Sequence, residues 1–257
     1  MASIRQVTNF VNVPPPTPLS PWQAPSMTIL QGSALIGWGT VPYGVDTVDG
    51  IPAYTYPSIF VTDNNSNTYA QFGRVNDPNN LSDAIAGTQL LVACVAFGLP
   101  AGTYTVQLMP GLGTNSYPED WVSFSAAEIV GVTGLNASNS ALQTQINAGT
   151  NNLNCTATAT AANCFAVAIT FDDEGSITHP GTPTVGTGLT AQTSSWNMVS
   201  GGVNTMCIGY ATLGAAGAFT ANFNATAGAD SQGRFADYLT ILGIFTTTPS
   251  MIPCAYI

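Results

Sequence analysis

A two-strand unit that occurs twice limits what this chain can fold into. The first copy runs from Gln89 to Met109 and the second from Asn204 to Asn224; Gly102 and Gly217, which close the two loops, are 115 residues apart (217 − 102). In each copy an apolar run leads into a loop of small residues, and a run of strictly alternating apolar and polar residues follows. This pattern predicts a hairpin in which a half-buried strand follows a fully buried one.

The alternating runs also predict which side chains are buried. Successive side chains of a strand point to opposite faces, so every second residue lies on the same side. The inward side is expected to carry the apolar residues of the two runs, which are Tyr104, Val106, Leu108, Phe219, Ala221 and Phe223. The outward side is expected to carry Thr, Asn and Gln.

Other segments recur in the same order around this unit. Residues 152–171 correspond to 27–40, 184–198 correspond to 58–72, and 237–245 correspond to 121–132. Segment 58–72 is itself predicted to be a hairpin, with Asp63 to Asn67 as turn residues that tolerate left-handed backbone. Residues 133–150 are predicted to be a polar connector, in which 141–146 forms a strand or a short helix.

No segment shows a convincing helical periodicity, and short strands separated by Gly, Pro and Asn turns are typical of sandwiches and jelly rolls. The sequence therefore predicts an all-β chain with two related β-sandwich (jelly-roll-like) lobes. We expect the first lobe at residues 27–134, and the second, with a C-terminal tail, at 135–257.

Residues 1–26 are predicted to form an extended N-terminal arm. Six prolines between residues 13 and 25 exclude a helix or a central strand and favour polyproline II conformation. Such a segment buries little surface by itself, so it is either a disordered tail or a strap on a neighbouring subunit. The predicted partner-contact residues are Phe10, Pro14, Pro15, Pro16, Leu19 and Trp22.

The charge content is very low and excludes several function classes. Charged residues make up 6% of the chain, there is no lysine, and the formal net charge is −10. Without lysine there is no P-loop and no Schiff-base chemistry, and with only Arg5, Arg74 and Arg234 as cations, binding to nucleic acid or to an anionic membrane is disfavoured. The first residues lack a basic start followed by an apolar stretch, so we expect synthesis in a cytoplasm without a secretion signal.

The five cysteines form no metal-binding pattern. Cys155 and Cys164 flank a short Thr- and Ala-rich segment, and a hairpin there could place them opposite each other. A disulfide is then possible if the protein works outside a cell. Buried free thiols are the favoured interpretation, because a free cysteine packs as a small apolar residue.

No catalytic, cofactor-binding or metal site is predicted. The acidic run Asp172–Glu174 and the turn at Asp63 have oxygen ligands suited to calcium, but neither matches an EF-hand loop. His179 is the only histidine, and it stands in a predicted loop without a GxSxG motif. A carboxylate pair for glycoside hydrolysis remains open for Glu119, Asp120 and Glu128, of which Glu128 lies in an apolar predicted strand.

Three segments resemble duplicated β-sandwich modules of tailed-bacteriophage virion proteins, and similar modules occur in bacterial surface proteins. These segments are 59–69, 101–106 (Ala-Gly-Thr-Tyr-Thr-Val) and 127–132 (Ala-Glu-Ile-Val-Gly-Val), and the resemblance covers residues 27–247. It implies a structural virion protein of the capsid-decoration, cement or fibre type.

From the resemblance and the composition we expect a non-enzymatic capsid decoration or cement protein without a cofactor. It would be made in the host cytoplasm, would form a homotrimer, and would bind other virion proteins such as a major capsid protein. The alternative is a phage tail or fibre protein, or a bacterial surface module, that binds glycans. In that case the loop residues Tyr43, Tyr54, Tyr56 and Tyr117 are candidates for stacking on sugars.

Overall fold

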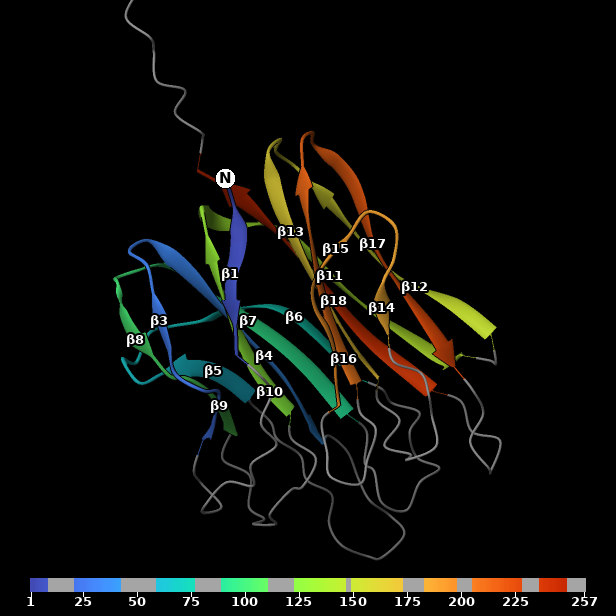
Figure 1. Cartoon of the computed structure of the whole chain (residues 1–257), viewed down its shortest axis with the longest axis horizontal. Helices are drawn as coiled ribbons and strands as arrows, with labels where there is room; N and C mark the ends of the chain where they lie inside the picture. Colours follow the sequence, from blue (N-terminus) through green and yellow to red (C-terminus); the bar gives the residue numbers. More distant parts are fainter. Residues whose placement is uncertain are drawn as a thin grey trace, which may run out of the picture.

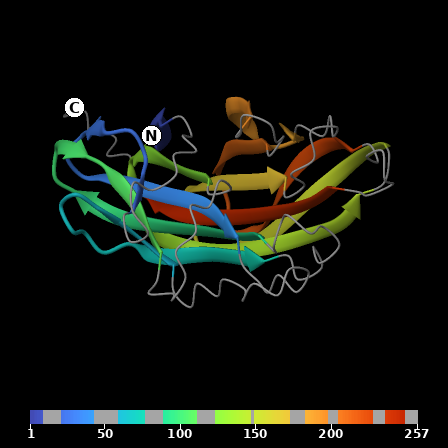
Figure 2. The same ribbon diagram turned by 90° about the horizontal axis from the view of Figure 1, so that it is seen from below.

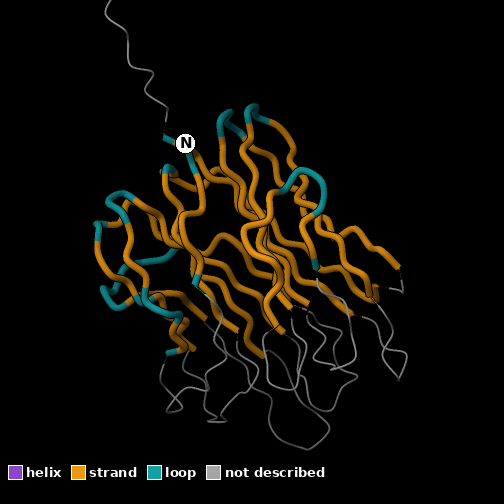
Figure 3. The backbone as a smooth tube through the Cα atoms, in the orientation of Figure 1, coloured by secondary structure: helices purple, strands orange, loops and turns teal. Residues whose placement is uncertain are grey.

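The structure is a computed structural model that describes residues 1–8, 21–42, 59–76, 89–110, 123–146, 149–172, 183–197, 205–227 and 236–248. Within these ranges every regular element is a β-strand, joined to its neighbours by turns and loops (Figure 3). The predicted all-β class is confirmed, and the strands group into antiparallel sheets that form two sandwich lobes.

The first lobe packs one large sheet against smaller ones. Its five-stranded antiparallel sheet has the order β1 (Ser3–Val7), β10 (Ser123–Val130), β4 (Ser33–Pro42), β7 (Gln89–Leu99) and β6 (Ala70–Asn76). The opposing layer contains β2 (Trp22–Gln23), β9 (Val106–Pro110) and β5 (Ile59–Asp63) in one sheet, and β3 (Met27–Ile29) with β8 (Gly102–Tyr104) in the other.

The second lobe has the same plan. Its five-stranded sheet has the order β11 (Val132–Ile146), β18 (Ala236–Thr247), β13 (Cys164–Asp172), β16 (Thr205–Leu213) and β15 (Thr190–Asn197). Its three-stranded sheet has the order β12 (Gly149–Ala159), β17 (Gly217–Ala227) and β14 (Thr184–Val185).

The two large sheets use equivalent strands at equivalent positions. Each large sheet begins with the first and last strands of its lobe, β1 and β10 or β11 and β18. The next three places are taken by β4, β7 and β6 in the first lobe and by β13, β16 and β15 in the second. This order agrees with the predicted correspondence between segments: β12 and β13 correspond to β3 and β4, β15 to β6, β16 to β7, and β18 to β10. The internal repeat is therefore a repeat of topology as well as of pattern.

Three apolar cores separate four layers of sheet. One core lies inside each sandwich, and a third lies between the two large sheets, where residues of β4 and β7 meet residues of β13 and β18. The strands of the first lobe lie on one side of Figure 1 and those of the second on the other, and Figure 2 shows them stacked in layers. The apolar runs of β7 and β16 are continuous because both of their faces lie against a core.

The contact between the lobes is close. Trp38 is fully buried and donates its indole N–H to the sulfur of Met206 across the central core at 2.6 Å. A Cβ added to Gly73 would lie 2.2 Å from Cγ2 of Ile241, and one added to Gly243 would lie 2.8 Å from the ring of Phe72. Glycine at both positions lets the large sheets approach each other.

The predicted hairpins are wrong in their pairing, although their strands are correct. β7 pairs with β4 and β6, whereas β8 pairs with β3 and β9 with β2 and β5. β16 and β17 are separated in the same way, as are β5 and β6. The loops of small residues therefore carry the chain from one sheet to the facing sheet. The pattern of apolar and polar residues in a strand indicates which of its side chains are buried, but it does not indicate which strand pairs with it.

Inward and outward residues of the alternating runs are as predicted. Tyr104, Val106 and Leu108 are buried in the first lobe, and Ala221 and Phe223 are buried in the second. Phe219 is partly buried against the same core as the latter two.

Two predicted irregular segments contain strands. Residues 3–7 of the predicted arm form β1, and the predicted connector forms the long strand β11, which pairs with β18. β10, the last strand of the first lobe, ends at Val130, and β11 begins at Val132. The chain therefore passes between lobes at Gly131, whose φ is +75°. Both strands lie at sheet edges and are rich in polar residues, which hid the apolar alternation in the sequence.

Candidate functional site

The residues predicted for partner contact are only partly within the described chain. Trp22 is 7% exposed and packs in the core of its own lobe, where β2 pairs with β9 through Trp22 and Leu108. Most of the Trp22 side chain is therefore enclosed in its own lobe, and its predicted contact with a neighbour stays a prediction. Phe10, Pro14, Pro15, Pro16 and Leu19 lie outside the described residues, and their predicted contacts stay a prediction.

The candidate metal and catalytic residues are only partly within the described chain. No group of three or more His, Cys, Asp and Glu side chains gathers there. His179, Glu119 and Asp120 lie outside the described residues, as do Tyr43, Tyr54, Tyr56 and Tyr117. The described segments also contain no helix with the length and hydrophobicity to cross a membrane.

The candidate calcium turn is filled by its own chain. The buried Asp63 carboxylate accepts hydrogen bonds from the backbone N–H groups of Asn65 at 2.9 Å and Asn67 at 3.2 Å, and from the hydroxyl of Tyr69 at 3.1 Å. Burial, together with this carboxylate, raises the pKa of the Tyr69 hydroxyl above its ordinary value. Donors on these oxygens compete with a cation, so Asp63 is a turn residue rather than a metal ligand.

The cysteines within the described chain are free and buried. Cys155 lies on β12 and Cys164 on β13, in facing sheets of the second lobe, and both thiols are free. Burial raises the pKa of the Cys94 and Cys155 thiols to about 11 and that of Cys207 to about 12. Protonated, enclosed thiols of this kind are inert, as the favoured interpretation of the sequence expected.

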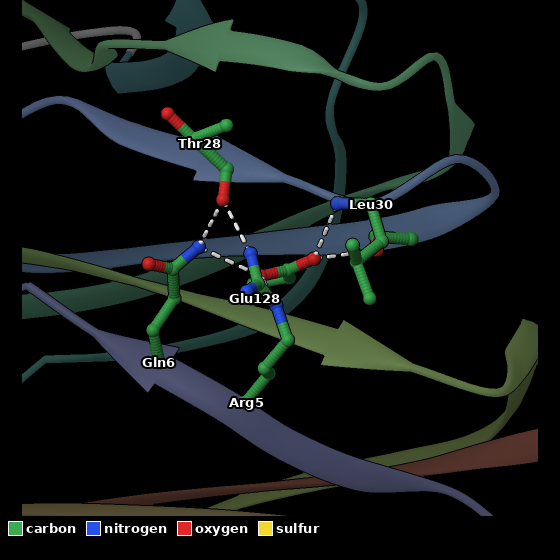
Figure 4. Close-up of polar contacts among 6 residues, drawn as sticks. Arg5, Gln6, Thr28, Leu30 and Glu128 are labelled. Atoms are coloured by element: carbon green, nitrogen blue, oxygen red, sulfur yellow. Dashed lines mark hydrogen bonds and ion pairs between the residues drawn. The ribbon is translucent and has the colours of Figure 1, made fainter.

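The most organised polar site in the first lobe surrounds Glu128. This residue lies on β10, its side chain has no exposed surface, and both carboxylate oxygens are occupied (Figure 4). One oxygen accepts from Arg5 Nε at 2.5 Å and Gln6 Nε2 at 2.7 Å, and the other accepts from Leu30 N at 2.8 Å and Ser33 Oγ at 2.7 Å. Three segments far apart in the sequence thus converge on one carboxylate.

The protonation of Glu128 follows from this environment. Burial by itself raises the pKa of the carboxyl, but the hydrogen bonds from Leu30, Ser33, Arg5 and Gln6 outweigh it and lower the pKa below the ordinary value of 4.5. The group is therefore ionised at neutral pH and forms an ion pair with Arg5. A fully bonded carboxylate has no free lone pair for a substrate, which speaks against the glycosidase role that the sequence left open.

Arg5 and Gln6 also bridge the two sheets of the first lobe. Besides Glu128, both side chains donate to the carbonyl oxygen of Thr28 on β3, Gln6 Nε2 at 2.7 Å and Arg5 through Nη2. β1 is therefore held by backbone pairing to β10 and by side-chain contacts to the facing sheet. We call these contacts of Arg5 and Gln6 with Glu128 and Thr28 the clasp.

The second lobe has a neutral counterpart of the clasp. Its first strand, β11, donates from Asn139 Nδ2 to Thr156 O at 2.7 Å and from Gln143 Nε2 to Asn154 O at 2.9 Å, both on β12. In both lobes the first strand thus bonds the carbonyl groups at the edge of the facing sheet. These hydrogen bonds occupy backbone carbonyl groups at the sheet edge, which could otherwise pair with a strand of another chain. Within the described residues, the first lobe adds the ion pair of Arg5 with the buried Glu128 to this arrangement.

The outer faces of both small sheets carry neutral hydroxyl and amide side chains in matched cross-strand pairs. On β12 and β17, Thr156 lies opposite Thr220, and their hydroxyls are 2.7 Å apart; Asn222 Nδ2 donates to Asn154 Oδ1 at 2.6 Å. The first lobe repeats this arrangement in the pairs Ser26–Thr105, at 2.7 Å, and Thr28–Thr103, at 3.3 Å. β12, β14 and β17 contain no charged residue at all.

Comparison with known proteins identifies no relative. No protein-family profile, no curated protein and no solved structure matches this chain. Its function is therefore argued from the fold, the clasp and the outer faces.

Sequence reasoning missed the clasp. It weighed Glu128 only as one member of a carboxylate pair and did not connect it with Arg5, which is 123 positions away. A usable signal was present, because a glutamate inside an apolar strand needs a partner and the chain has only three cations.

Proposed function

We propose that this chain is a non-enzymatic structural protein of a virus particle, and that it decorates and cements a phage capsid. The observation that carries the proposal is the strand order. In the second lobe the large sheet holds the first, eighth, third, sixth and fifth strands in that order (β11, β18, β13, β16, β15), and the small sheet holds the second, seventh and fourth (β12, β17, β14). We interpret each lobe as a jelly roll with one strand moved to the large sheet, an architecture frequent in viral capsid proteins.

The packing of the lobes also suits a structural role. A continuous core joins the two large sheets, so the duplicated lobes form one rigid building block rather than two domains that open and close around a ligand. The outer faces are neutral, with hydroxyl and amide groups that can both donate and accept hydrogen bonds. Burying such faces between protomers involves no charge desolvation, which is consistent with the proposed homotrimer and with contacts to a major capsid protein.

The alternative class is a glycan-binding fibre or surface module. Jelly rolls also occur in lectins, and hydroxyl-rich neutral faces hydrogen-bond to sugars as well as to proteins. The two proposals differ in what the protein binds, so they are separated by experiment.

The first experiment asks where the protein resides. Particles from the source culture are purified on a density gradient, and the protein is sought by mass spectrometry and by immunogold labelling with antibodies raised against the recombinant chain. We expect it in the particle fraction, at a fixed ratio to the major capsid protein and distributed over the capsid. Labelling confined to tails, or recovery only from cell envelopes, would contradict the decoration role.

A glycan array with the purified chain tests the alternative. A Thr156→Ala, Thr220→Ala double variant removes one hydroxyl pair from the outer face without touching a core. Binding to a glycan that this variant loses would favour the alternative, whereas absence of any glycan signal would leave the capsid proposal as the better supported one.

A further inference from the structure

We propose that β1 is exchanged between copies of this chain, so that the first strand of one protomer completes the large sheet of its neighbour. The docking place is the β10 edge with the Glu128 carboxylate, and its occupant is β1 of a second copy. The inference rests on the proposed structural function and names how neighbouring copies hold one another.

β1 depends on the rest of the lobe entirely through contacts that another copy can supply. It is an edge strand, paired with β10 from Ser3–Val130 to Val7–Ala127. Its further contacts are the clasp and the packing of Ile4 in the central core. An exchanged strand makes the same contacts in trans, so the exchange needs no new interface.

The chain after β1 is long for the gap that it has to bridge. The N–H of Thr8 still bonds to Ala126 on the large sheet, and the N–H of Ala24 bonds to Val106 on the facing small sheet. Facing sheets lie about 10 Å apart. The 13 residues from Asn9 to Pro21 include five prolines, and in polyproline II conformation they would reach roughly 40 Å. A Pro-rich connection of that length is long enough to reach a neighbouring subunit.

The clasp gives the exchange its specificity. Without β1, the buried Glu128 carboxylate loses its cation and two of its four donors. An unpaired buried charge is strongly unfavourable, so an empty β10 edge recruits a strand that brings an arginine in the correct register. Only another copy of β1 is certain to carry Arg5 and Gln6 at that spacing. In the described part of the second lobe no charged side chain is buried, and its first strand, β11, follows directly from β10 through Gly131.

A cysteine cross-link distinguishes docking in trans from docking in cis. Ser3 and Val130 lie opposite each other in an antiparallel pair, where Cα atoms are about 4.5–5.5 Å apart, within disulfide range. A Ser3→Cys chain and a Val130→Cys chain, carrying different tags, are co-expressed, oxidised and analysed on non-reducing gels. We expect a disulfide-linked dimer that carries both tags. The control is a Ser3→Cys chain with a Thr158→Cys chain, which places the second thiol on the distant outer face of β12.

The double variant Ser3→Cys, Val130→Cys completes the test. If it closes within single chains while the mixed chains give no dimer, β1 docks in cis and the proposal is wrong. Sedimentation of the purified protein provides a second measurement that needs no added thiol. Arg5→Ala is expected to weaken self-association by about tenfold or more, because it leaves the buried Glu128 carboxylate without its cation. An unchanged association constant, or a wild-type chain that is monomeric at every concentration, would overturn the exchange.

These readouts use the purified protein and do not involve the virus particle. Failure of the exchange therefore leaves the particle test intact. Conversely, a mixed disulfide in a protein that is absent from particles would refute the proposed function and not the exchange.

Discussion

Replacing Glu128 by alanine tests whether the buried carboxylate holds the first lobe together. The substitution removes the acceptor of four hydrogen bonds and leaves their donors in place. The donors differ in what they can do next. Arg5 is 37% exposed, and with Gln6 it lies at the edge of the lobe, so both can turn to water. The buried hydroxyl of Ser33 has no such freedom, whereas Leu30 is 52% exposed and its N–H can bond to water.

The expected magnitude follows from Ser33 and from the ion pair. A buried donor left without a partner costs about 1–3 kcal/mol, whereas the partly exposed ion pair contributes about 1 kcal/mol or less. Together they give a loss of about 3 kcal/mol, against a total stability of roughly 5–15 kcal/mol for a typical protein. In a chain of this size each kcal/mol lowers Tm by about 2–4 °C, so we expect Tm to fall by roughly 6–12 °C.

Thermal unfolding followed by circular dichroism measures this loss, and urea unfolding at 25 °C provides a second value. Thr158→Ala is the matched control, because Thr158 is exposed on β12 opposite Ala218 and should change stability by less than about 0.5 kcal/mol. If Glu128→Ala lowers Tm no more than this control, the carboxylate is not a structural centre and the clasp has no energetic role.

Three further predictions use other features of the fold. The pKa of Glu128 is lowered in the folded state, so its stabilising contribution is complete above the ordinary value of 4.5 and is lost as the pH falls through the lowered pKa. As the pH falls below 4.5, the Tm of the wild type should therefore drop more steeply than the Tm of Glu128→Ala. Gly73→Ala should destabilise by about 1–3 kcal/mol, because its Cβ would lie 2.2 Å from Ile241, whereas Gly214→Ala, with open space around it, should be neutral in the same urea titration. A thiol reagent at neutral pH should leave four cysteines unmodified until urea unfolds the chain, and fast labelling of the native protein at any of them would contradict their burial: Cys94, Cys155, Cys164 and Cys207.

The sequence by itself determined the class of fold and the repeat. Apolar runs and strict alternation are local properties, and they located β7, β9, β16 and β17 with the correct inward faces. The absence of lysine and the low charge likewise needed no structure to exclude phosphate and Schiff-base chemistry. These conclusions could be drawn from the sequence because they depend on the kind of side chain at each position and not on which segments are in contact.

Only the tertiary structure decided which strand pairs with which. An apolar run buried on both faces has the same sequence pattern whether its successor is a hairpin partner or lies in the opposite sheet. β7 and β8 therefore were predicted to be one hairpin, although each pairs with other strands. Strand pairing is a contact between segments that are distant in the sequence, and the residues of one strand do not indicate which other strand it pairs with.

The edge strands and the clasp depended on the tertiary structure for the same reason. β11 is stabilised by its pairing with β18, whose residues lie about 90–115 positions later, so its polar sequence predicted a connector. Arg5 and Glu128 are ordinary residues in the linear chain, and they form a site because β1 and β10 are neighbours in the large sheet. A buried charge can be recognised in a sequence as a residue that needs a partner, but the fold alone chooses the partner.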